Sequence, residues 1–324
     1  MNIFISSKIM NIFMLLILLA AMLLLASCGS GTASPPNEPH TSGNNDHLLE
    51  GDPEDFIKIP AASGAKVKKT TLSGESIIDY SNIAQGYVMM KNNGSQRGLK
   101  GYIKTPGGIF YQYNLKADDA FIVCPLQAGN GKYSIQIMEQ TVGNFYRPIA
   151  KVNVKVTLDD EMLPFLYPNY KVNFSAHSDC VAKAEELTAG LPTDLEKIKA
   201  IYDYVVKNIK YDDQKAEEVQ PGYTPDPDRT LKEGKGICSD YSALLAAMLR
   251  SQNIPAKMIE GDVSPGDIRH AWNLVYTKEA GIIAMKIAFN GTWEMIDPTL
   301  DAKLGYGMEE YIGDGIVYKE DLCF

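Results

Sequence analysis

The chain has 324 residues, of which 45% are hydrophobic, and its 40 acidic and 31 basic side chains give a formal net charge of -9. This acidic balance, without a cluster of Lys and Arg, argues against nucleic acid as a partner and against attraction to an anionic membrane surface. With the N-terminal segment set aside, the length is enough for two ordinary domains with separate cores.

Residues 1–27 have the organisation of a secretion signal. Lys8 precedes a mostly apolar run from Ile9 to Leu25, and small residues follow before a cleavage point. An uncleaved membrane helix is the alternative, but the uninterrupted stretch 12–26 is shorter than the ~20 residues that span a bilayer. The pattern therefore predicts export.

Cys28 follows Leu-Ala-Ser, a pattern that resembles the lipobox of bacterial lipoproteins, in which the cysteine is lipidated and becomes the mature N-terminus. The resemblance implies lipidation at Cys28 and a lipid-anchored position on the extracytoplasmic face of the cell membrane. Residues 28–64 are rich in Ser, Gly, Pro, Asn and Asp, which is typical of a tether without fixed structure.

Residues 65–160 contain short alternating runs separated by turn signals such as Thr105-Pro-Gly-Gly and Gly129-Asn-Gly. In one run Tyr133, Ile135 and Ile137 alternate with polar residues, and the run from Ala150 to Val156 repeats the pattern. Period two indicates half-buried strands. We expect several antiparallel strands in an immunoglobulin-like sandwich, which serves as a spacer, a binding module or a passive unit.

Residues 165–324 combine helical and strand patterns and predict an α+β domain. Thr193 and Glu196 form a capping-box pattern, and the apolar residues that follow mark one helix face up to Ile209. A second helix is expected from about Cys238. Strands are expected from Ile254, around His270, and as a pair joined by the turn signal Asn290-Gly291.

The five cysteines are Cys28, Cys124, Cys180, Cys238 and Cys323. If Cys28 is lipidated and Cys238 is the nucleophile, three cysteines remain, and they are not closely spaced. A disulfide framework is therefore not expected. Cys180 lies at helical spacing from Ala184 and Leu187, which favours a small core residue.

Three short motifs suggest thiol chemistry on a carbonyl carbon. They are Gly234-Lys-Gly-Ile-Cys238-Ser-Asp-Tyr, His270-Ala-Trp-Asn, and Trp293-Glu-Met-Ile-Asp297-Pro-Thr. The first turn of a helix favours a thiolate and offers backbone N–H groups to an oxyanion. Cys238 is therefore the candidate nucleophile, His270 the general base, and Asp297 the group that holds the imidazole tautomer.

Two further side chains are candidates near this constellation. Alternation puts Trp272 on the same strand face as His270, where it either shields the ion pair from water or simply packs. Tyr211 is a candidate oxyanion donor or another packing residue. The chain has no Cys-x-x-Cys and no paired-histidine spacing, so we expect no metal and no cofactor.

These residues resemble the transglutaminase-like superfamily, in its bacterial branch, whose core is papain-like. The resemblance runs from about Leu195 to Leu300 and includes Tyr223-Thr-Pro-Asp-Pro-Asp, Gly236-Ile-Cys238-Ser-Asp-Tyr, His270-Ala-Trp-Asn273 and Asp297-Pro-Thr. It implies a thioester acyl-enzyme at Cys238. The connection 277–289 is longer than the minimal hairpin of the family, and it either shapes a substrate groove or only adds a strand.

The expected function is a peptidase or amidase acting on a protein or peptide substrate, since water is the default acceptor at an exposed site. Two alternatives stay open. An amine acceptor would make the protein a cross-linking acyltransferase, and a non-catalytic surface lipoprotein would only bind a protein or wall component.

Overall fold

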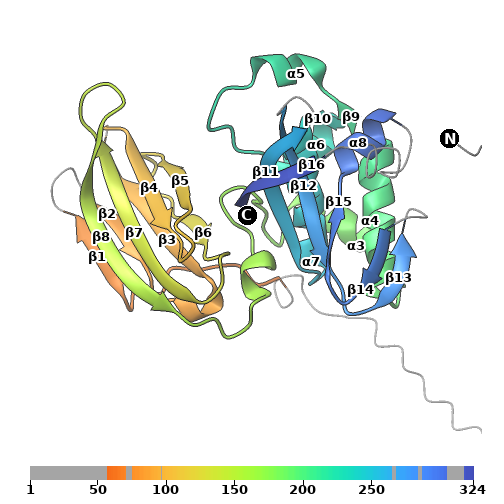
Figure 1. The fold of residues 1–324 in the computed structure, drawn as a ribbon, viewed down its shortest axis with the longest axis horizontal. Helices are drawn as coiled ribbons and strands as arrows, with labels where there is room; N and C mark the ends of the chain where they lie inside the picture. Colours follow the sequence, from red (N-terminus) through yellow and green to blue (C-terminus); the bar gives the residue numbers. More distant parts are fainter. Residues whose placement is uncertain (1–56, 71–74, 96, 265–267, 284–286, 305–316) are drawn as a thin grey trace, which may run out of the picture. The chain divides into compact units, whose positions relative to one another are not determined.

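The computed structural model describes residues 57–70, 75–95, 97–264, 268–283, 287–304 and 317–324 (Figure 1). The predicted signal peptide, Cys28 and the tether up to residue 56 lie outside the described residues. Within the described ranges, no helix has the length and apolar character needed to cross a membrane.

In the described residues of the N-terminal half, eight strands form two four-stranded antiparallel sheets (Figure 1). The first sheet has the order β1-β2-β3-β6, formed by Val67–Thr70, Glu75–Asp79, Tyr87–Asn93 and Ile122–Pro125. The second has the order β5-β4-β7-β8, formed by Phe110–Leu115, Leu99–Lys104, Gly131–Gln140 and Tyr146–Val156. A short 3-10 turn, η1 (Ile83–Gln85), precedes β3.

The alternation in β7 is confirmed by burial, because Tyr133, Ile135 and Ile137 are buried while their polar neighbours are partly or fully exposed. The two sheets approach closely. A Cβ atom on Gly101 of β4 would lie 2.4 Å from the Cε atom of Met90 on β3, so a larger residue at this position would require the methionine side chain to shift. The immunoglobulin-like assignment stays a prediction.

The predicted tether extends too far along the chain. Residues 57–64, expected to lack fixed structure, are placed against the strands without forming one. Ile57 is buried, and the amide of Gly64 donates to the Asp79 carboxylate at 2.7 Å. A segment that buries an apolar side chain and satisfies backbone amides in this way packs as part of the folded region.

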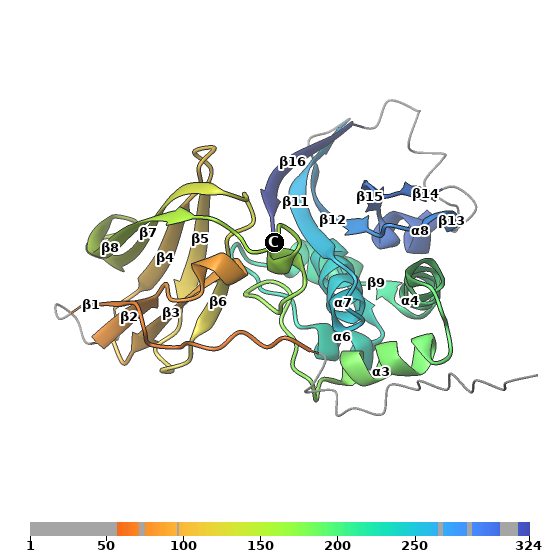
Figure 2. The same ribbon diagram turned by 90° about the horizontal axis from the view of Figure 1, so that it is seen from below.

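The C-terminal domain places its helices against a four-stranded antiparallel sheet of order β15-β12-β11-β16 (Figure 2). These strands are Trp293–Ile296, Ile268–Tyr276, Ala256–Ser264 and Val317–Cys323. The helices are η2 (Leu163–Phe165), α3 (Asp179–Thr188), α4 (Asp194–Asn208), α5 (Asp213–Glu218), α6 (Pro227–Glu233), α7 (Cys238–Ser251) and α8 (Pro298–Leu304). Two small sheets pair β9 (Lys210–Tyr211) with β10 (Lys235–Gly236), and β13 (Ala280–Ile283) with β14 (Ile287–Asn290).

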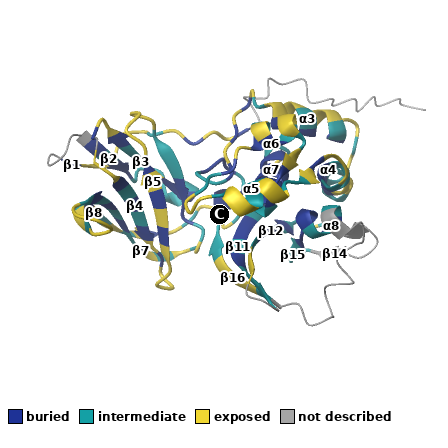
Figure 3. Cartoon of the chain, turned by 90° about the horizontal axis from the view of Figure 1, so that it is seen from above, coloured by how far each residue is buried: buried dark blue, intermediate teal, exposed yellow. Residues whose placement is uncertain are grey.

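The helix α7 is the centre of this domain. Every residue from Asp240 to Arg250 is buried, and α7 packs against β11, β12 and the helices α3, α4 and α6 (Figure 3). The predicted helix start at Cys238 is therefore correct. The predicted cap of α4 is also present, because the Thr193 hydroxyl accepts from the amide of Glu196 at 3.2 Å and donates to the Glu196 carboxylate at 2.9 Å.

One predicted hairpin is wrong. The turn at Asn290-Gly291 exists, with Gly291 in the left-handed region at φ +83, but the strands on its two sides belong to different sheets. β14 pairs antiparallel with the preceding strand, β13. β15 pairs with β12, where Asn273 lies opposite Ile296. A turn signal fixes a local reversal, whereas the partner of each strand is decided by longer-range packing.

Candidate active site

The sequence before α7 delivers Cys238 to the first position of a buried helix. Gly234 adopts a left-handed conformation at φ +62 and ends α6, and the chain then forms the two residues of β10. A Cβ atom on Gly236 would lie 2.6 Å from the Cβ of Asp240, so this glycine lets the first turn of α7 fold against the incoming chain. The first amides of a helix have no intrahelical acceptor, and they lie at the positive end of its dipole.

Side-chain hydrogen bonds fix α7 against the strand that carries the candidate base. The Ser242 hydroxyl donates to the carbonyl of Trp272 at 2.9 Å, and the Asn273 amide donates to the carbonyl of Ser242 at 3.0 Å. The same amide group reaches the carbonyl of Lys257 on β11 at 3.1 Å. Cys238 and His270 therefore belong to elements that are joined within four residues of each of them.

His270 and Asp297 are brought together by the pairing of β12 with β15. β15 ends at Ile296, and Asp297 is the next residue. The His270 Nε2 atom lies 2.7 Å from the Asp297 Oδ2 atom, and the carboxylate is fully buried. The predicted contact between the two side chains is present.

The surroundings of Asp297 determine which ring nitrogen carries the proton. Its Oδ1 atom accepts from the amides of Thr299 and Leu300 at 3.1 Å each, and its Oδ2 atom accepts from the Tyr318 hydroxyl at 3.1 Å. Both oxygens of this carboxylate therefore act as acceptors. The His270 Nε2 atom must then donate, which leaves Nδ1 as the nitrogen that can accept a proton from Cys238.

Charge favours the imidazolium form of His270. Burial by itself lowers the pKa of His270, but hydrogen bonds to Asp297 and Cys238, together with the negative charges of these two groups, raise it from 6.5 to about 10. The three predicted side chains thus interact as one unit, with the imidazole between the sulfur and the carboxylate.

Cys238 and His270 open on a cavity of about 510 Å³. Other residues that line it are Tyr211, Tyr223, Glu260 and Arg269. Cys238 itself is only partly buried, so a substrate carbonyl that enters this cavity can reach the sulfur.

The two additional candidates occupy different places. Tyr211 lines the cavity beside Cys238, because β9 pairs with β10 and sets Tyr211 opposite Gly236. Burial and the negative charge of Cys238 raise the pKa of Tyr211, so its hydroxyl stays protonated and able to donate. Trp272 is 1% exposed and does not line the cavity; its ring stacks on His270 at 6.3 Å between centroids.

The structure adds residues that the motifs do not show. Tyr318 on β16 donates to Asp297 and packs edge-on against Trp272, with ring centroids 4.9 Å apart. It comes from β16, and no sequence pattern near position 318 indicates a site residue. Asp240 forms a buried network with Lys215 and Tyr223, of which the sequence shows only that an acidic residue suits the first turn of a helix.

The long connection between His270 and Asp297 forms the β13–β14 hairpin. Glu279, just before this hairpin, accepts from the amides of Asp194 and Leu195 at 3.2 and 2.9 Å, so the segment caps the start of α4. The side chains described in this connection, those of residues 277–279, do not line the cavity at Cys238. The contacts of Glu279 give the segment a structural role, and its part in shaping a groove stays a prediction.

The four described cysteines carry free thiols. Cys180 is fully buried, as its helical spacing predicts, and Cys124 is buried between strands of the N-terminal domain. Within the described part of the chain, no three His, Cys, Asp or Glu side chains are grouped in a way that could hold a metal ion.

Comparison with known proteins agrees with this arrangement. Residues 181–287 match the family model of the transglutaminase-like superfamily, a range that includes Cys238 and His270 and ends before Asp297. The chain is 25% identical over 140 residues to kyphoscoliosis peptidase of Homo sapiens, which covers 40% of this chain and 19% of that protein. It is 37% identical over 68 residues to a UPF0252 protein of Methanocaldococcus jannaschii, which covers 19% of each. The chain thus spans 19% of the length of both relatives.

Solved structures with a detectable likeness include a candidate cysteine protease from Cytophaga hutchinsonii, at 14% identity and a TM-score of 0.32, covering 74% of this chain and 86% of that one. They also include red sea bream transglutaminase, at 13% identity and a TM-score of 0.30, covering 66% and 48%. The family assignment rests on the matched core, which holds the cysteine and the histidine on the expected helix and strand. Residues 181–287 of this chain thus form a transglutaminase-like core.

Proposed function

We propose that this protein is a thiol enzyme that attacks peptide or glutamine amide carbonyls through an acyl-enzyme at Cys238. The transglutaminase-like core supports a thiol enzyme in general. The observation that carries the proposal is the position of His270, which contacts the buried Asp297 carboxylate at 2.7 Å and shares a cavity of about 510 Å³ with Cys238.

The reaction follows from the proton positions described above. The Cys238 thiol gives its proton to His270 Nδ1, and the thiolate adds to the substrate carbonyl carbon. When the carbon–nitrogen bond breaks, the imidazolium protonates the leaving amine or ammonia, and a thioester remains on the sulfur. Water then attacks the thioester, His270 takes a proton from it, and the acid product leaves with the thiol restored.

Amides of the first turn of α7 would bind the oxyanion of the tetrahedral intermediate, and each donor of this kind typically contributes a few kcal/mol to the transition state. Tyr211 is the candidate for an additional side-chain donor, because it lies in the cavity with its hydroxyl protonated. Trp272 would keep water from the face of the His270 ring that it covers, and it contributes packing in either case.

We propose hydrolysis as the outcome, which makes the protein a peptidase or amidase. Cys238 is partly exposed, so bulk water reaches the thioester without a dedicated acceptor site. The human relative named kyphoscoliosis peptidase supports this choice over cross-linking. Transfer to an amine is the second candidate, because the acyl-enzyme is common to both reactions.

The proposed location is the extracytoplasmic face of the cell membrane, with a lipid on Cys28. The support is the Leu-Ala-Ser-Cys28 pattern after an apolar run. Wild type and Cys28→Ala should partition differently, with the wild type in the membrane fraction and the variant in the soluble fraction. Equal partitioning of the two would remove the anchor from the proposal.

The decisive experiment incubates wild type and Cys238→Ala with a protein mixture and a labelled primary amine, followed by mass spectrometry. New chain termini indicate a peptidase, loss of ammonia with a gain of about one dalton indicates a deamidase, and amine incorporation indicates a cross-linker. If the wild type produces none of these and matches Cys238→Ala, the protein is a binding lipoprotein and the enzyme proposal fails.

A further inference from the structure

A buried carboxylate lies two residues after the candidate nucleophile. Asp240 is 0% exposed, and its Oδ2 atom accepts from the amide of Ile237 at 2.8 Å and from Lys215 Nζ at 2.6 Å. Its Oδ1 atom accepts from the Tyr223 hydroxyl at 2.7 Å. All three neighbours are donors, so both carboxylate oxygens act as acceptors.

This anion creates an electrostatic problem for Cys238. A negative charge within the first turn of the same helix disfavours a second negative charge on the sulfur, and it offsets the positive end of the helix dipole. In a buried setting such repulsion is poorly screened. A site that needs a thiolate at Cys238 therefore needs a cation beside Asp240.

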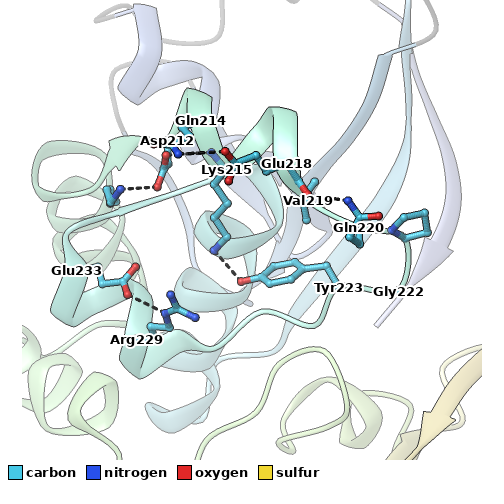
Figure 4. Close-up of a pocket in the computed structure, with 12 residues that line it drawn as sticks. Asp212, Gln214, Lys215, Glu218, Val219, Gln220, Gly222, Tyr223, Arg229 and Glu233 are labelled. Carbon is cyan, nitrogen blue, oxygen red and sulfur yellow. Dashed lines mark hydrogen bonds and ion pairs between the residues drawn. The ribbon is translucent and has the colours of Figure 1, made fainter.

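Lys215 is in the position to supply that cation. It comes from α5, which precedes the loop that leads to Tyr223 (Figure 4). Its side chain is only 23% exposed. Its Nζ atom contacts both Asp240 and the Tyr223 hydroxyl, the latter at 2.7 Å. Burial and the hydrogen bond to Asp240 raise the pKa of Tyr223, so the phenol stays a neutral donor. Lys215 is the cation that contacts the Asp240 carboxylate.

Tyr223 is held at both ends, which fixes the cluster relative to the site. Its hydroxyl contacts Lys215 and Asp240, and its carbonyl accepts from Lys171 Nζ at 3.0 Å. Lys171 is in turn paired with Glu260 of β11 at 2.8 Å. Tyr223 lines the cavity at Cys238 and also a neighbouring cavity of about 680 Å³ in which Lys215 lies.

We propose that Lys215 is a positioning residue of the thiol site, whose charge balances the buried Asp240 carboxylate so that Cys238 ionises readily at the start of α7. The role rests on the proposed thiol function. It explains why a charged pair is buried beneath a helix start, where an apolar pair would cost less desolvation.

Other charged and titratable groups also act on Cys238. Those lining its cavity are Lys171, Tyr211, Tyr223, Glu260, Arg269 and His270. They stay unchanged in the variants below, so the comparison isolates the pair formed by Lys215 and Asp240.

The test measures the rate of Cys238 alkylation by iodoacetamide against pH, in the full chain solubilised in detergent, by quantifying the peptide that contains Cys238. We expect Lys215→Met to move the midpoint of the rate increase upward by about one pH unit, which is roughly a tenfold slower reaction below the midpoint. Asp240→Asn leaves an unbalanced cation and should move the midpoint downward. The double variant, without either charge, should return close to wild type.

A matched control is Lys199→Met, which removes an exposed lysine from the Lys199–Asp203 pair on α4 and should leave the midpoint unchanged. A double variant that reacts as slowly as Lys215→Met would overturn the proposal, because a purely structural defect is not rescued by a second substitution. If Lys215→Met does not fold, Asp240→Asn decides alone, and an unchanged or raised midpoint overturns the role of Lys215.

The wild type separates this proposal from the function on which it rests. If wild-type Cys238 alkylates no faster than a free model thiol, the thiol enzyme itself is refuted, and the role of Lys215 with it. A fast wild type with unresponsive charge variants refutes the role of Lys215 alone.

Discussion

Asp297→Asn removes the negative charge beside His270 while keeping the shape of the side chain. The asparagine oxygen can still accept from the amides of Thr299 and Leu300, so the start of α8 should stay intact. Its NH2 group then faces the His270 Nε2 atom, where the carboxylate now lies at 2.7 Å. Because this group donates, the imidazole proton moves to Nδ1, and the nitrogen next to Cys238 can no longer act as a base.

The size of the effect follows from the electrostatics of His270. Burial lowers its pKa, and yet the pKa is raised from 6.5 to about 10, so the stabilisation of the imidazolium by Asp297 and Cys238 together exceeds the desolvation cost by roughly 5 kcal/mol. A wrong tautomer in a triad of this type lowers kcat by about 10⁴-fold, which is a similar free energy. We expect Asp297→Asn to lose about 10³- to 10⁴-fold in kcat/KM, with the remaining rate supplied by binding and the oxyanion donors.

The assay follows cleavage or deamidation of whichever substrate the mass spectrometry identifies, with circular dichroism to show that the variant is folded. The folded-state pKa of His270 lies above its ordinary value, so its pairing with Asp297 stabilises the native state fully below about pH 6.5 and is lost as pH rises towards about 10. This loss should be absent in the variant. A folded Asp297→Asn protein with more than a tenth of wild-type kcat/KM would refute the assigned role of the carboxylate.

Three further substitutions test separate parts of the structure. Tyr318→Phe removes one donor to Asp297 and should lower kcat/KM by roughly fivefold, the equivalent of about 1 kcal/mol. An unchanged rate and pH profile would show that this hydrogen bond does not contribute to the reaction. Gly261→Ala places a Cβ atom 2.1 Å from a carbonyl oxygen of β16 and should lower the free energy of unfolding by about 1–3 kcal/mol in denaturant titration. In the control Gly107→Ala no atom lies nearer than 4.0 Å to the new Cβ atom, and the free energy of unfolding should change by less than about 0.5 kcal/mol. Glu279→Ala removes the acceptor of two amides at the start of α4 and should lower the free energy of unfolding by about 1 kcal/mol with kcat/KM unchanged. A raised KM would indicate that the connection 277–289 helps to shape the substrate groove.

Much of the site could be predicted because each motif specifies its own local structure. Gly234 and Gly236 before Cys238 indicate a tight turn into a helix, and the structure places the helix start at that residue. The alternation around His270 gives the strand and the shared face with Trp272. Local rules of this kind act over a few residues, and they are the part of the fold that one sequence reveals most directly.

The parts that could not be predicted depend on distant partners. Tyr318 reaches Asp297 only because β16 pairs with β11, a contact that no local pattern encodes. Lys215 looks like an ordinary surface residue in sequence, and the motif that begins at Tyr223 does not show that both side chains meet at Asp240. The wrong hairpin at Asn290-Gly291 has the same cause, since the choice of strand partner is a property of the whole sheet.

The motif His270-Ala-Trp-Asn273 does two separate tasks because successive residues of a strand point to opposite faces. On one face His270 and Trp272 stack, and the imidazole meets Asp297. On the other face the Asn273 amide donates to the carbonyl of Ser242 on α7. The strand of the candidate base is therefore hydrogen-bonded to the helix that begins at Cys238. This hydrogen bond and the one from the Ser242 hydroxyl to the Trp272 carbonyl hold the two elements together. Since a shift of about 1 Å between reacting groups can cost roughly 10²-fold in rate, we expect Asn273 to influence the proposed reaction through geometry, without contact to the substrate.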